Sequence, residues 1–159
     1  MTVGLDVSAY RQLRPAPEAK LDTNGEPLDF EYFVRFGAGQ AWAEGHWPGR
    51  AAPIALGVYS FTERFDFRAG SYSGYGEWRR TLRRVRPDLN AFQELIEFAD
   101  NEGTLGTYVA AKLHRDFVSH RQSVLALVPE PERQWFAGSY ALWATAFLIA
   151  ADGGAVELH

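Results

Sequence analysis

The sequence predicts an α+β fold with a single domain over residues 1–159, in which a small, mainly antiparallel sheet from the N-terminal half packs against about four helices from the C-terminal half. Two observations predict this class. Before residue 70 the apolar residues alternate with polar ones or form short runs, whereas after it they recur three or four positions apart. The chain also has 159 residues, 47% of them hydrophobic, which suffices for one self-supporting core.

The first strand is expected over residues 2–10, where apolar and polar residues alternate, so that the polar groups lie on the face opposite the core. Residues 14–28 are rich in proline and charge and predict an exposed loop or hairpin tip. Residues 30–36 fit either a strand or a helix. Residues 37–53 contain four glycines and two prolines and are expected to be mostly irregular.

A second strand is predicted over residues 54–61, a nearly continuous apolar run of strand length that is typical of a central position in a sheet. Residues 62–66 are expected to turn the chain. Residues 65–70 alternate again and predict a partner strand, and the short connection favours an antiparallel hairpin with residues 54–61.

Helical spacing follows. Trp78, Leu82 and Val85 predict one helix. Residues 92–99 predict a second with Asp88 as its cap, although a strand is an alternative there. Three further elements are expected: a helix over 105–117, a helix from Pro131 to residue 150, and a short strand over 155–159.

Bulk properties exclude several functions. The net charge of −4 gives no global attraction to nucleic acid or acidic membranes. The absence of cysteine excludes disulfides and thiolate chemistry. The N-terminus does not resemble a signal peptide, and the longest uncharged run, residues 136–151, is shorter than the roughly 20 residues of a membrane span. We expect a cytoplasmic protein without membrane association, cofactor or metal site, and the sequence does not predict its oligomeric state.

The strongest candidate for a binding surface is the glycine-rich, serine-rich and aromatic segment 67–80. A serine at the start of the following helix, free N–H groups and nearby arginines are suited to an anionic ligand, and the aromatic rings to a stacked base or sugar. The candidate residues are Arg68, Ser71, Tyr72, Ser73, Tyr75, Trp78 and Arg79. The alternative, which the sequence favours slightly, is a connection whose serine caps the helix and whose rings fill the core.

A second candidate is the acidic turn containing Asp100 and Glu102, which offers carboxylates for a cation, for ligand hydroxyls or for general-base chemistry. Its alternative is a plain turn between helices. Lys112 is a third candidate, with an ion-pair ladder to Asp116 and His120 as the alternative. The arginines between 79 and 86 suit phosphates, but the overall acidity argues against nucleic acid.

Several segments together resemble a family of uncharacterised proteins from bacterial and bacteriophage genomes. They include Gly4-Leu5-Asp6-Val7-Ser8-Ala9-Tyr10, Phe67-Arg68-Ala69-Gly70-Ser71-Tyr72-Ser73-Gly74-Tyr75 and Asp152-Gly153-Gly154-Ala155-Val156. That family carries Ser-Asp-Cys where this chain has Ala99-Asp100-Asn101, so a cysteine-based role would not transfer. The resemblance implies no reaction, but it implies one site shared by the polar residues Arg68, Ser71, Tyr72, Ser73, Asp100, Glu102 and Lys112. The phage occurrence suggests a nucleotide signal in phage–host conflict.

Three functions remain open at this level. The first is non-catalytic binding of a small polar or anionic ligand. The second is a small hydrolase or transferase that uses Asp100 or Glu102 as its base. The third is a protein–protein interaction module, such as an inhibitor or immunity protein, that uses Trp42 and Trp47.

Overall fold

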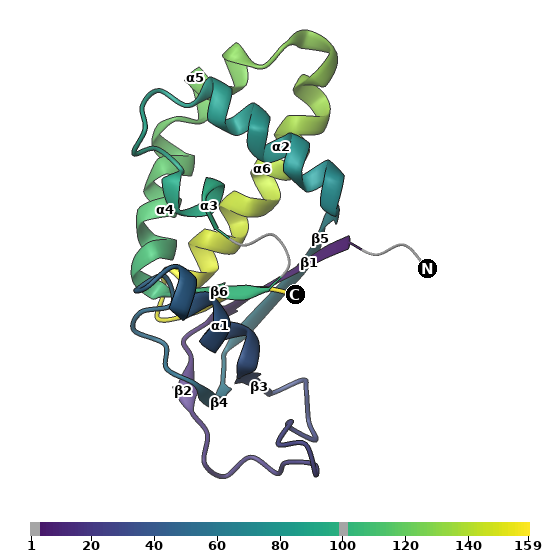
Figure 1. Cartoon of the computed structure of the whole chain (residues 1–159), viewed down its shortest axis with the longest axis vertical. Coiled ribbons are helices and arrows are strands. Elements are labelled where there is room, and N and C mark those ends of the chain that lie inside the picture. Colours follow the sequence, from purple (N-terminus) through teal and green to yellow (C-terminus); the bar gives the residue numbers. More distant parts are fainter. Residues whose placement is uncertain (1–3, 99–101) are drawn as a thin grey trace.

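The computed structural model describes residues 4–98 and 102–159 (Figure 1). Within these ranges the strands are β1 (Gly4–Arg11), β2 (Arg14–Pro15), β3 (Phe33–Phe36), β4 (Gly57–Ser60), β5 (Glu63–Ser71), β6 (Gly103–Leu105) and β7 (Ala155–Leu158). The helices are α1 (Ala38–His46), α2 (Tyr72–Val85), α3 (Gln93–Ile96), α4 (Thr107–Ser119), α5 (Arg121–Leu127) and α6 (Glu130–Ala150).

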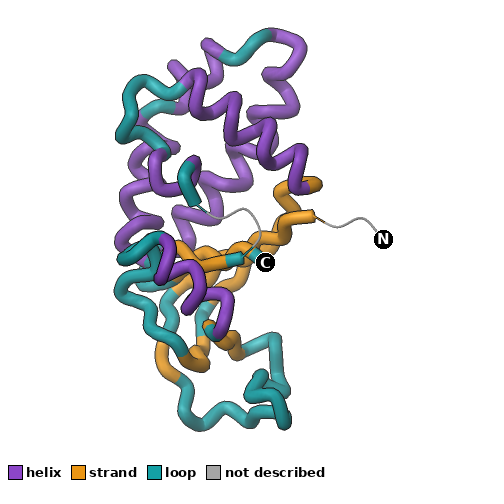
Figure 2. Tube along the Cα trace, viewed as in Figure 1, coloured by secondary structure: helices purple, strands orange, loops and turns teal. Residues whose placement is uncertain are grey.

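The strands form two antiparallel sheets, which confirms the α+β class. The larger sheet has the order β5-β1-β7-β6 and the smaller one the order β2-β4-β3. The C-terminal half supplies β6 and β7 to the larger sheet as well as most of the helices. Figure 2 shows most of the helices gathered on one side of this sheet, whereas α1 and the long irregular segment before β3 lie on the other.

Strand β1 occupies the centre of this arrangement and has two different faces. Leu5, Val7 and Ala9 are buried towards the helices. The alternating residues Ser8 and Tyr10 belong to the other face, as expected from the two-residue period of a strand. The alternation predicted for residues 2–10 is therefore confirmed from residue 4 onward, and residues 2 and 3 lie outside the described part of the chain.

The predicted hairpin between residues 54–61 and 65–70 is wrong. Strand β4 pairs with β2 and β3, whereas β5 pairs with β1 in the other sheet. The predicted turn at 62–66 is largely the start of β5. Proximity in sequence favoured the hairpin, but the apolar face of β5 is buried together with that of β1 under the helices, and this long-range pairing prevails.

The helix predictions also need three corrections. Residues 37–53 are not mostly irregular, because α1 lies within them and buries Gln40 and Ala43, and this burial outweighs the low helix propensity of its glycines. The helix predicted over 92–99 is only the short α3, which Asp88 precedes as a turn residue, accepting from the N–H groups of Asn90 and Ala91. Helix α5 was not predicted.

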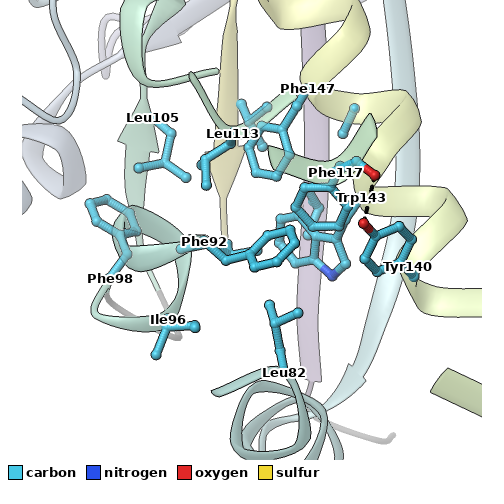
Figure 3. Close-up of a cluster of buried hydrophobic side chains, with 14 of the residues drawn as sticks. Leu82, Phe92, Ile96, Phe98, Leu105, Leu113, Phe117, Tyr140, Trp143 and Phe147 are labelled. Carbon is cyan, nitrogen blue, oxygen red and sulfur yellow. Dashed lines mark hydrogen bonds between the residues drawn. The ribbon is translucent and has the colours of Figure 1, made fainter. Parts of the chain in front are cut away.

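Helices α2, α4 and α6 cover the apolar face of the larger sheet and enclose an aromatic core (Figure 3). Trp143 is fully buried and stacks on Tyr75, Trp78 and Phe147. The Tyr140 hydroxyl donates to the Phe117 carbonyl oxygen at 2.6 Å, which satisfies an acceptor in the last turn of α4. None of the helices in the described part of the chain has the length and hydrophobicity required to traverse a lipid bilayer.

The opposite face of the larger sheet is divided. At one end Tyr10 and Ala155 pack against residues of the smaller sheet, Val34, Phe36 and Tyr59, in a second apolar cluster. The rest of this face is polar and borders a cleft.

Candidate functional site

A cleft of about 420 Å³ lies over the polar face of the larger sheet. This volume is within the range of small-molecule sites. Its floor includes Tyr10 from β1, Arg64 from β5 and Glu157 from β7, with His159 just beyond β7. Its walls come from the segment before β3, from the start of α1 and from Glu102 before β6. The cleft therefore joins segments that are far apart in the sequence.

Glu157 is the most unusual group in the cleft. The register of the sheet places it beside Ser8 on one side and Thr104 on the other. Among the described residues, no hydrogen bond or ion pair engages its partly buried carboxylate. The pKa of Glu157 is raised from 4.5 to about 7, mainly by burial; Arg64 opposes the rise, and the charges of Glu26, Asp66 and Glu102 contribute to it. The carboxyl is thus about half protonated at neutral pH.

The two arginines that line the cleft already have acidic partners. The Arg64 Nε donates to both carboxylate oxygens of Asp66 at 2.9 Å, and its guanidinium lies 5.6 Å from the centre of the Tyr10 ring. The Arg35 Nη1 donates to Glu26 at 3.0 Å and to the carbonyl oxygen of Asn24 at 2.9 Å. Their positive charges are therefore largely compensated.

A hydrogen-bonded chain supports the floor beside Glu157. The buried Ser8 Oγ donates to Asp66 at 2.6 Å and lies 3.0 Å from the His159 Nε2. Because the single hydroxyl hydrogen of Ser8 goes to Asp66, the His159 Nε2 must carry a hydrogen and donate to Ser8. This chain fixes the orientation of the His159 ring at the cleft.

The groups left over in the cleft are mainly acceptors. Glu102, like Glu157, has no ion-pair partner within the described parts of the chain. Gln40, which lines the wall, donates its amide nitrogen to the Ile54 carbonyl at 2.8 Å, and its buried Oε1 has no hydrogen-bond partner among the described residues. The cleft therefore offers negative charge and unsatisfied acceptors to a ligand.

Of the residues predicted as a site, Glu102 lines this cleft, and Asp100 lies outside the described residues. Arg68 lies on β5, with its Nη1 3.5 Å from Asp6. Ser71 caps α2 by accepting from the Gly74 N–H at 3.0 Å, and its Oγ lies 3.2 Å from that of Ser73. Tyr72 follows it and is 38% exposed.

The remaining predicted residues are engaged elsewhere. Tyr75 and Trp78 are buried in the core, and Trp78 donates its indole N–H to the Phe136 carbonyl. Arg79 donates to the Phe98 carbonyl at 2.7 Å. Lys112 forms ion pairs with Glu94 and Asp116, both at 2.7 Å.

Among the described candidates, only Glu102 faces the cleft. The segment 68–79 instead ends β5 and begins α2, and β5 and β6 are the opposite edges of the sheet. Among the described residues, the candidates of segment 68–79 therefore do not line the cleft with Glu102. Trp42, proposed for protein contacts, is 44% exposed on α1 and contacts the rings of His46 and Trp47.

Sequence reasoning missed most of the cleft, although a signal was present. The same alternation that buries Leu5 and Val7 places Ser8 and Tyr10 on the polar face. Strands β5 and β7 repeat it: β5 contributes Arg64 and Asp66, β7 contributes Glu157, and His159 follows β7. The combined polar faces of three strands were the available clue.

The described residues contain no group of three or more histidine, aspartate or glutamate side chains arranged to hold a metal ion. Comparison with protein-family models found no match, and comparisons with curated proteins and with solved structures found none either.

Proposed function

We propose that the cleft binds a small organic cation rich in hydrogen-bond donors, such as an amine or a guanidinium. The observation that carries this proposal is the pair of carboxylates, Glu102 and Glu157, that form no ion pair among the described residues, beside two arginines that are already paired with Glu26 and Asp66. The expectation of a small polar ligand is retained. An anion would face uncompensated negative charge, so the cationic class is better supported.

Binding of a cation is coupled to a proton. An opposite charge near Glu157 favours its ionised form and lowers its pKa from about 7. The carboxyl is about half protonated at pH 7, so binding releases up to about half a proton there. The affinity consequently rises as the pH increases from about 6 to 8, where the free protein already holds the charged form.

Isothermal titration tests this proposal. Putrescine, agmatine and arginine amide are titrated at pH 7 in two buffers of different ionisation enthalpy, with AMP as the anionic comparison. We expect binding of at least one cation, proton release, and at least a tenfold loss of affinity in Glu157→Gln.

The matched control is Glu132→Gln, which removes an exposed carboxylate at the start of α6 and should leave the affinity unchanged. Equal cation affinity in the wild type and Glu157→Gln would refute the proposal, and so would binding of AMP without binding of any cation.

A further inference from the structure

The segment that walls the cleft continues beyond it as an ordered arm, residues 17–32. Asp22 Oδ1 accepts from the N–H groups of Asn24 and Glu26, and an isolated antiparallel bridge joins Leu21 to Pro27. The Arg35 side chain ties Asn24 and Glu26 to β3. The arm is therefore held in place before any partner binds, which reduces the entropy cost of association.

A second hollow of about 690 Å³ lies along this arm. Phe30 and Phe33 line both this hollow and the cleft, so the two are neighbours that share one aromatic wall. The second hollow is also bordered by Leu28, by three exposed acids, Glu18, Asp29 and Glu31, and by Lys20, so its lining is acidic on balance. A ligand longer than a single amine can thus occupy both.

The surface of the arm is both acidic and apolar. Residues 17–32 contain five acidic side chains and one lysine. Four large apolar side chains are also exposed: Leu21 by 46%, Leu28 by 63%, Phe30 by 59% and Tyr32 by 60%. Clustered exposed aromatic residues are typical of interaction surfaces, and the excess of negative charge selects a positive partner.

We infer that the cation bound in the cleft is a lysine or arginine side chain of a basic polypeptide segment, which continues over Phe30 into the second hollow. This inference rests on the proposed function, because it uses the same carboxylates. Side chains two residues apart in an extended chain lie about 7 Å from each other on one side, which suits two adjacent hollows. A peptide can place a basic side chain in each hollow and apolar side chains on the aromatic wall.

Fluorescence anisotropy with a labelled ten-residue peptide of alternating lysine and leucine tests the inference. The single-residue probe is Nα-acetyl-lysine methylamide, measured by competition, and spermine is the non-peptide polycation. We expect the peptide to bind at least tenfold more tightly than the single residue and than spermine. Its affinity should fall steeply between about 50 and 300 mM salt, since exposed charges are screened.

Two double variants separate the arm from the cleft. Glu18→Gln with Glu31→Gln should weaken the peptide about fivefold or more and leave the single-residue probe unchanged. Glu97→Gln with Glu132→Gln removes two exposed carboxylates away from the arm and should change neither.

The outcomes distinguish the inference from the proposed function. If the single residue binds but the peptide binds no more tightly, or the arm variant has no effect, the inference fails and the cation site stands. If spermine binds as tightly as the peptide, the inference of a peptide partner is refuted and a polyamine is the better ligand class. If no cation binds, both proposals fall.

Discussion

The two faces of the sheet β5-β1-β7-β6 differ in the side chains that they bury. On the helical face, Trp143 and Phe147 are fully buried and stacked among other rings. On the polar face, Glu157 is held among other acids, without an ion-pair partner in the described residues, at a cost to stability. The first face maintains the fold, and under the proposed function the second retains an unfavourable group because a ligand would use it.

The largest effect is expected on the helical face. Trp143→Ala should lower the free energy of unfolding by about 3–5 kcal/mol, because it removes a fully buried ring and leaves a cavity. Urea denaturation measures the loss. Trp135, on the same helix but 47% exposed, is the matched position, and Trp135→Ala should cost about 1 kcal/mol or less. Similar losses at both positions would contradict this description of the core.

On the polar face, we expect a substitution to raise the stability of the protein instead of lowering it. The pKa of Glu157 rises from 4.5 to about 7 on folding, so the native state binds the extra proton and stability falls as pH rises through this window. Glu157→Gln removes that penalty. We expect the variant to be more stable than the wild type by about 1–3 kcal/mol at pH 8 and equally stable near pH 4.5.

Urea denaturation of both proteins across this pH range checks the prediction. Loss of stability in Glu157→Gln at pH 8 would show that the carboxylate is stabilised where it lies, and the contrast between the faces would disappear. If Glu157→Gln gains stability and loses cation affinity, the contrast between the two faces is strengthened.

The smallest effect on stability is expected where β5 ends and α2 begins, outside both the core and the cleft. Ser71→Ala should lower stability by about 1 kcal/mol, because the Gly74 N–H loses its cap. Ser71→Asp should restore most of it. Cation affinity should be unchanged in both, since Ser71 lies outside the cleft; a large change would return the α2 start to the binding site.

Local signals in the sequence predicted much of the fold. The alternation in residues 2–10, described from residue 4 onward, and the apolar stripe of residues 136–150 each specify an element from neighbouring positions alone. A serine at the start of the helix after residue 70 was also expected, at Ser73, but the residue that caps α2 is Ser71. Strand pairing is not a local property. Residues 54–61 and 65–70 are neighbours in sequence, yet their apolar faces are buried in different clusters, so the hairpin prediction failed.

The cleft was harder to predict for the same reason. Its floor is assembled when β1 pairs with β5 on one side and β7 on the other. Only this pairing brings Asp66 and His159 to Ser8, and no spacing in the sequence reports it. The segment 67–80 drew attention because its residues are contiguous, and its aromatic rings proved to belong largely to the core.

Strand β1 serves the core with one set of side chains and the cleft with the other. Inserting or deleting one residue within Gly4–Arg11 would exchange the two sets, exposing Leu5 and Val7 while forcing Asp6 and Ser8 under the helices. Substitution at alternate positions has no such consequence. Arg64 on β5 and Glu157 on β7, which line the cleft, can therefore be substituted at constant chain length without changing the face that packs under the helices.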